Sequence, residues 1–147
     1  MNARPAIDER VITERILLIE KHVGRLKELR DLSPGEFMLP NHFDAAAWNL
    51  RCALEAVFDV AAHVLSRIPG VSFEGYRDMA LKLGEQNIIP QAFAEETLVK
   101  MAGYRNRLTH FYFEVAPEEM YRIVTDHLTD FDVFAGHIKR LLATSLA

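Results

Sequence analysis

A short polar segment near residue 105 concentrates the side chains most capable of chemistry. Two arginines, an asparagine, a histidine and a tyrosine fall within eight consecutive positions: Arg105, Asn106, Arg107, His110 and Tyr112. An arginine guanidinium binds a phosphate through paired, charge-assisted hydrogen bonds, and a histidine exchanges protons near neutral pH. The segment therefore indicates a phosphodiester site, with Arg105 as the phosphate ligand and His110 as base or acid.

The local backbone decides whether these two side chains meet. In a continuous helix Arg105 and His110 would lie about 140° apart around the axis. If instead the helix ends near Leu108, His110 and Tyr112 project to one side of an extended stretch. They would then face Arg105 across a common pocket.

RNA cleavage suits such a site because the neighbouring 2′-hydroxyl group is the nucleophile. A base, a charge-stabilising group and in-line positioning are then sufficient, so we expect no metal and no cofactor. The other five histidines are scattered and lack the spacing of a zinc site. The sequence also contains no glycine-rich phosphate loop and no GxSxG elbow.

Ordinary structural roles explain the same residue types. Arg105 and Arg107 could be solvated cations that interact favourably with a helix dipole. On that interpretation His110 is a loop residue and Tyr112 a packing residue. Residue chemistry by itself leaves both interpretations open.

Composition places limits on the class of protein. The chain has 147 residues, a net charge of −4 and one cysteine, Cys52, which cannot form an internal disulfide. No apolar run is long enough for a membrane span, and the first ten residues contain no apolar signal region. We expect a cytoplasmic protein whose nucleic-acid contacts are local, because broad phosphate attraction usually requires a basic chain.

Apolar residues recur at intervals of three and four along most of the chain, which predicts amphipathic helices. The first stripe is Ile12, Ile16, Ile19, Val23 and Leu26. The predicted helices are about 7–32, 44–67 and 74–83, one that opens at Pro90 and one that opens after Pro117. Asp44 is the expected N-cap of the second helix, and Gly84 the residue that ends the third.

No segment shows the alternation of a strand, and the loops are short. We therefore predict an all-α, antiparallel, up-and-down bundle of four to five helices, as a single domain over residues 1–147.

The sequence resembles the HepT toxin family, within the HEPN superfamily of small all-α ribonucleases. The family signature Arg-x4-His-x-Tyr is matched by Arg105, His110 and Tyr112, and Asn106 follows the arginine as is usual. The likeness covers most of the chain, including the second predicted helix from Leu54 to His63 and the run from Tyr76 through Gly84 to the signature.

The resemblance implies a homodimer in which two signatures face one another and form a composite RNA-cleaving cleft. It implies that Arg105 holds the phosphate and His110 transfers protons. It also implies a type VII-like toxin–antitoxin system, in which a nucleotidyltransferase antitoxin silences the toxin by attaching AMP to Tyr112. RNA is the implied substrate, with tRNA as the family-level expectation.

Five further residues are candidates for auxiliary roles: Tyr104, Asn106, Arg107, Glu55 and Asp59. Arg107 is interpreted as an additional phosphate contact. Glu55 and Asp59 lie one helical turn apart and could orient Arg105 or Arg51. Alternatively, the two carboxylates pair with Arg51 and His63 on a solvated helix face.

Two other functions are compatible with the sequence. The chain could be a non-catalytic helical dimer that binds a nucleotide or a nucleotidyltransferase partner. It could also be an accessory subunit that uses Tyr112 only as an acceptor. The complete triplet of Arg105, His110 and Tyr112 favours the enzyme.

Overall fold

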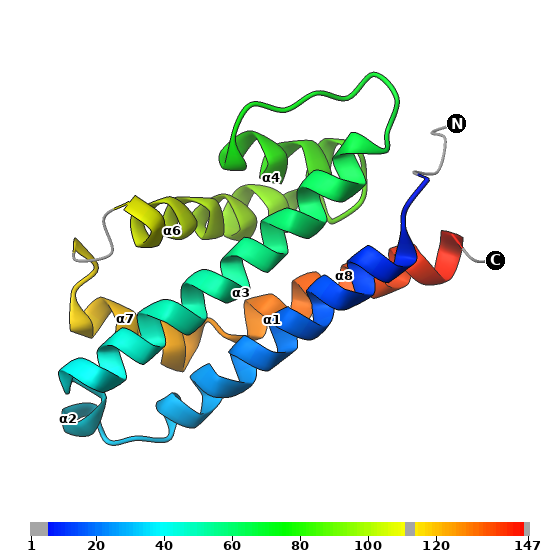
Figure 1. Ribbon diagram of the computed structural model, residues 1–147. Coiled ribbons are helices and arrows are strands. Elements are labelled where there is room, and N and C mark those ends of the chain that lie inside the picture. Colours follow the sequence, from blue (N-terminus) through cyan, green and yellow to red (C-terminus); the bar gives the residue numbers. More distant parts are fainter. Residues whose placement is uncertain (1–5, 111–113, 146–147) are drawn as a thin grey trace.

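The computed structural model describes residues 6–110 and 114–145, and most of these residues are helical (Figure 1). The elements are α1 (Glu9–Arg30), α2 (Pro34–Phe37), α3 (Pro40–Ser66), α4 (Tyr76–Glu85), α5 (Gln91–Phe93), η1 (Ala94–Leu98), α6 (Val99–His110), α7 (Pro117–Asp126) and α8 (Thr129–Ser145). No strand occurs in the described ranges, so the predicted all-α class is confirmed. None of the described helices has the length and apolar character needed to cross a membrane.

Helix α1 lies along α3, and the two form the largest helix–helix contact of the fold (Figure 1). The predicted stripe of α1 is buried at every position: Ile12, Ile16, Ile19, Val23 and Leu26. The start of α1 is capped as well, because the Asp8 carboxylate accepts hydrogen bonds from the amides of Arg10 and Val11.

Helix α3 is the central element, because it also contacts α4, α6 and α7. Its middle is apolar on more than one face, with Leu54, Val57, Phe58 and Val60 all buried. A helix that packs on several sides fixes the relative positions of its neighbours. The position of α6 relative to the solvent-exposed face of α3 is therefore fixed by this packing.

Three predicted helix boundaries were wrong. Helix α3 begins at Pro40 rather than at Asp44, because proline suits the first position of a helix. The first helix ends at Arg30 rather than near residue 32, and the Ser33 hydroxyl caps the short helix α2 that follows. Gly84 lies inside α4, and the left-handed residue after that helix is Asn87, with φ of 58°.

The predicted final helix is divided into α7 and α8 at His127. The amides of Asp130 and Phe131 bond to the carbonyls three residues earlier, which marks a tight turn. As a result, Leu128 is buried and His127, which the three-four spacing from Val124 would place on the apolar face, is exposed. The apolar period resumes in phase at Phe131, so the sequence pattern concealed the break.

Helices α5, η1 and α6 follow one another without interruption, and η1 is a π-helical turn in the middle. Here the chain passes very close to α4. A Cβ atom added to Gly84 would lie 2.8 Å from the Cβ of Ala94. The lack of a side chain at Gly84 therefore permits the approach of α4 to the segment that leads into α6.

Candidate active site

Helix α6 continues to His110, two residues past Leu108, so the earlier helix end that would bring Arg105 and His110 together is not seen. Arg105 and His110 thus belong to one continuous helix and lie about 140° apart around its axis. The extended stretch that would bring them together does not begin before residue 111. Tyr112 lies outside the described residues, so its place relative to Arg105 stays a prediction.

Arg105 is held between two neighbouring helices. Its Nη2 lies 2.9 Å from Oε1 of Glu55 on α3, and the two side chains are 13% and 32% exposed. Its guanidinium carbon lies 3.9 Å from the ring centre of Tyr76, the first residue of α4. A charged partner at one edge and an aromatic ring against one face fix the guanidinium in position.

Tyr76 was not singled out as a site residue from the sequence. It lies 29 positions before Arg105 in the chain, and only the packing of α4 against α6 brings them together. Tyr76 is held in turn by an edge-on contact with Phe58, with ring centres 5.4 Å apart. A tyrosine at the start of a short helix gives no sequence signal for such a role.

Of the two candidate carboxylates Glu55 and Asp59, Glu55 is the one that contacts the α6 segment. Its Oε1 also accepts a hydrogen bond of 3.5 Å from the Thr109 hydroxyl. Asp59 instead pairs with Arg15 of α1, at 3.3 Å. Burial raises the pKa of Asp59 above its ordinary value, and the Arg15 guanidinium opposes this shift.

The proposed alternative pairings of these carboxylates are not seen among the described residues. The Nε2 atom of His63 accepts a hydrogen bond from the Asp8 amide, at 3.0 Å. Arg51 stacks near the ring of Trp48, at 5.7 Å. The Asn106 side chain accepts a bond of 3.2 Å from Nη1 of Arg105, which adds a further polar contact to that guanidinium.

Arg107 lies on another side of α6 and forms an ion pair with a carboxylate. Its two terminal nitrogens each lie 2.8 Å from an oxygen of Glu119, which is on α7. The Tyr104 hydroxyl donates to the same carboxylate at 2.9 Å. The hydrogen bonds from Arg107 lower the pKa of Glu119, assisted by that from Tyr104, while burial raises the pKa of Tyr104.

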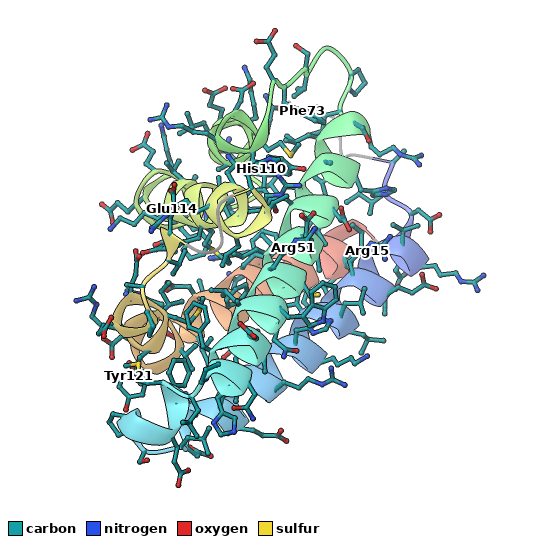
Figure 2. The ribbon with its side chains drawn as sticks, turned by 60° about the vertical axis from the view of Figure 1, so that its left-hand side comes forward. Arg15, Arg51, Phe73, His110, Glu114 and Tyr121 are labelled. Atoms are coloured by element: carbon teal, nitrogen blue, oxygen red, sulfur yellow. The ribbon has the colours of Figure 1, made fainter. Side chains whose placement is uncertain are left out.

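An open strip of α3 runs beside the ion pair. Trp48, Arg51, Glu55 and Asp59 succeed one another at intervals of three or four and share one face. They line a shallow groove of about 260 Å³ between α1 and α3. Figure 2 labels Arg15, Arg51 and His110 on α1, α3 and α6, with α3 in the foreground.

Another cleft, between described residues, is lined by neither Arg105 nor His110. It has a volume of about 590 Å³ and lies between α3, α6 and the α7–α8 junction. Its apolar wall includes Leu54, Met101 and Phe131, and its rim includes Arg107. Among the residues that the structure describes, no group of three or more His, Cys, Asp or Glu is placed to hold a metal ion.

Comparison with known proteins places this chain among HepT-like ribonucleases. The family model described as "Ribonuclease HepT-like" matches residues 19–138. A protein of Aphanizomenon flos-aquae named tRNA nuclease HepT is 23% identical over 142 residues, which are 94% of this chain and 94% of that protein.

Solved structures agree with the family match. A tri-AMPylated HEPN toxin of Shewanella oneidensis, in complex with its MNT antitoxin, is 28% identical, with a TM-score of 0.76 over 91% of this chain and 99% of that one. A toxin–antitoxin structure with AMP-PNP is 27% identical, with a TM-score of 0.76 over 90% and 99%. The cytosolic protein YutE of Bacillus subtilis, 20% identical, shares the fold with a TM-score of 0.78 over 97% of this chain and 95% of that one.

The fold and the family match together define a small all-helical ribonuclease. The chain belongs to the HepT-like family, which confirms the resemblance found in the sequence, and the protein is an endoribonuclease.

Proposed function

We propose that the protein is a toxin that cleaves RNA without a metal, through Arg105 and His110. The observation that carries the proposal is the environment of Arg105, whose guanidinium is oriented by Glu55 and Tyr76. Arg105 lies five residues before His110, the last residue of α6. An arginine oriented in this way presents fixed donors to a phosphate, and fixed donors stabilise the charge that develops in the transition state.

The reaction is a transfer of the phosphoryl group within the RNA chain. The 2′-oxygen attacks the adjacent phosphorus, the bond from phosphorus to the 5′-oxygen breaks, and the products carry a 2′,3′-cyclic phosphate and a 5′-hydroxyl. One proton leaves the 2′-hydroxyl and one reaches the 5′-oxygen. His110 serves in this proton transfer, and Arg105 neutralises the phosphate.

The active form is a homodimer with a cleft built from two copies of the segment. Two observations support this arrangement. Arg105 and His110 diverge on a single helix, so a second copy supplies the facing groups. The face of α3 that carries Glu55 also carries Trp48, which is 56% exposed, and an exposed tryptophan is typical of a protein interface.

A nucleotidyltransferase antitoxin silences the toxin by attaching AMP to Tyr112. Support comes from the solved relative that is described as a tri-AMPylated toxin in complex with its antitoxin. Tyr112 is two residues after His110 in the sequence. A bulky anionic adduct there would compete with RNA phosphate for Arg105.

We further propose tRNA as the substrate and the cytoplasm as the place of action. The relative named tRNA nuclease HepT supports the substrate, because the match spans 94% of both chains. Which tRNA is cleaved depends on surface shape in the dimer rather than on a base-reading motif.

Intact-mass spectrometry paired with RNA cleavage tests the proposal. The protein is produced alone and together with a nucleotidyltransferase antitoxin, and each sample is incubated with total tRNA. We expect cleavage by the unmodified protein, with adenylyl mass increments and loss of cleavage in the co-produced sample. A folded dimer that cleaves no RNA would contradict the proposal and favour a non-catalytic binding module. A Tyr112→Phe variant that still cleaves RNA but is not modified would separate the proposed cleavage from the proposed silencing at Tyr112.

A further inference from the structure

The carboxylate of Glu119 is the centre of a polar cluster that joins α6 to α7. It accepts two bonds from Arg107, at 2.8 Å each, and one from the Tyr104 hydroxyl, at 2.9 Å. The Arg107 guanidinium also lies 5.3 Å from the Tyr104 ring. We call Tyr104, Arg107 and Glu119 the α6–α7 clamp.

The clamp holds the last turn of α6 through contacts from α7. Arg107 is three residues before His110, the final residue of the helix. Glu119 lies in the first turn of α7, so the ion pair spans the connection between the two helices. Nη2 of Arg107 also lies 3.4 Å from the carbonyl oxygen of Glu114, which adds a contact with the connection itself (Glu114 is labelled in Figure 2).

A second anchor lies beside the clamp. Val115 follows Glu114 and is 1% exposed, so the connection is packed against the core immediately before α7. The last turn of any helix is weakly constrained, because its carbonyl groups lack intrahelical partners. Here contacts from α7 and from residues 114–115 compensate for that weakness.

The two arginines of the segment, Arg105 and Arg107, thus have different structural roles. They are about 160° apart around the helix and pair with different helices, α3 and α7. Both terminal nitrogens of Arg107 donate to one carboxylate, whose charge offsets the guanidinium charge that would attract an RNA phosphate. This geometry differs from the phosphate contact that the sequence suggested.

We propose that Arg107 and Glu119 are positioning residues, which hold the C-terminal turn of α6 so that His110 meets the scissile phosphodiester. The inference rests on the proposed role of His110. Neither residue touches RNA. Their contribution is to the rate of the chemical step, because a small displacement of a catalytic group is costly.

Steady-state cleavage of tRNA by four variants tests the inference. Arg107→Met, Glu119→Gln and the double variant remove the clamp, and Lys100→Met removes a cation from an exposed position of the same helix as a matched control. We expect kcat to fall about 10- to 100-fold in each clamp variant, with KM within about twofold of the wild type. The double variant should be no worse than the single variants, because both disrupt one interaction.

The opposite pattern would overturn the inference. If Arg107 contacts RNA, Arg107→Met raises KM while Glu119→Gln leaves kcat unchanged. The milder variants Tyr104→Phe and Arg107→Lys, whose folding is checked by circular dichroism, replace any clamp variant that does not fold.

The NMR signal of the His110 ring separates this inference from the proposed function. We expect it to shift in Arg107→Met and in Glu119→Gln but not in Lys100→Met. A shift in a protein whose wild type does not cleave RNA would leave the clamp intact and refute the proposed function. An unmoved signal, together with unchanged kcat in an active protein, would refute the clamp alone.

Discussion

Glu55 on α3 and Arg105 on α6 form an ion pair with a separation of 2.9 Å between Oε1 and Nη2. The pair connects the central helix of the fold to the helix that carries the signature residues. Asp59 lies one turn further along α3 but pairs with Arg15 of α1. Of two neighbouring carboxylates, one therefore supports the site and the other holds two helices together.

This difference predicts different effects for two isosteric substitutions. Glu55→Gln keeps an acceptor but removes the charge that orients Arg105, so kcat/KM for RNA should fall about tenfold or more. Asp59→Asn should leave kcat/KM within about twofold, since its ion pair is exposed and is made with Arg15 rather than with Arg105. Equal losses in both variants, measured by steady-state cleavage, would contradict the assignment of Glu55.

The exposed Trp48 predicts the location of the interface in the proposed dimer. Replacement by glutamate should raise the dimer dissociation constant about 30-fold or more, because a central aromatic residue is lost and a charge is introduced. Val133→Glu on α8, another exposed apolar position, is the control and should leave the dimer intact. Sedimentation velocity over a concentration series measures both. An unchanged dimer in Trp48→Glu would place the interface elsewhere.

The close approach of α4 to η1 predicts opposite effects for two glycine substitutions. Gly84→Ala places a Cβ 2.8 Å from that of Ala94 and should lower the free energy of unfolding by about 1–3 kcal/mol. Gly24→Ala, on an exposed face of α1 with nothing within 4 Å of its added Cβ, should raise it by about 0.5–1 kcal/mol. Urea denaturation measures both values. A stabilised Gly84→Ala variant would mean that the two segments are less tightly packed than described.

The clamp predicts an acid-dependent loss of stability. Hydrogen bonds from Arg107 and then Tyr104, with the charge of Arg122 nearby, lower the pKa of Glu119 below its ordinary value of 4.5, although burial opposes them. A carboxylate with a lowered pKa stabilises the fold above its unfolded-state pKa, and this stabilisation disappears as pH falls through the folded-state value.

The wild type should therefore be more stable than Glu119→Gln at pH 5–7, and the difference should shrink below about pH 4.5. Urea unfolding at a series of pH values measures it. A difference that stays constant down to pH 3 would show that the Glu119 charge does not stabilise the clamp.

Much of the helical pattern was accessible from the sequence, because burial follows local periodicity. Every residue of the first predicted stripe is buried in α1. The break at His127 was missed since the apolar period resumes in phase, and α2 was missed since four residues give no period. The continuation of α6 to His110 was not predictable because its last turn is stabilised by Glu119, twelve positions beyond Arg107.

The site was only partly predictable, because some of its contacts join residues that are distant in the sequence. The signature residues are neighbours in the sequence, and a resemblance could identify them. Tyr76 and Glu119 reach Arg105 and Arg107 through the packing of separate helices, so no local pattern marks them. Arg107 has the residue type of a phosphate ligand, and only its paired contact with Glu119 suggests another role.

The most direct test of the central claim is the structure of the RNA ends produced in the presence of EDTA. Wild-type protein, Arg105→Ala and His110→Ala are incubated with tRNA, and the fragments are analysed by mass spectrometry. We expect EDTA-resistant cleavage by the wild type, with 2′,3′-cyclic phosphate and 5′-hydroxyl ends, and a loss of about 100-fold or more in each variant. Fragments with 3′-hydroxyl ends, cleavage abolished by EDTA, or undiminished cleavage by His110→Ala would contradict it.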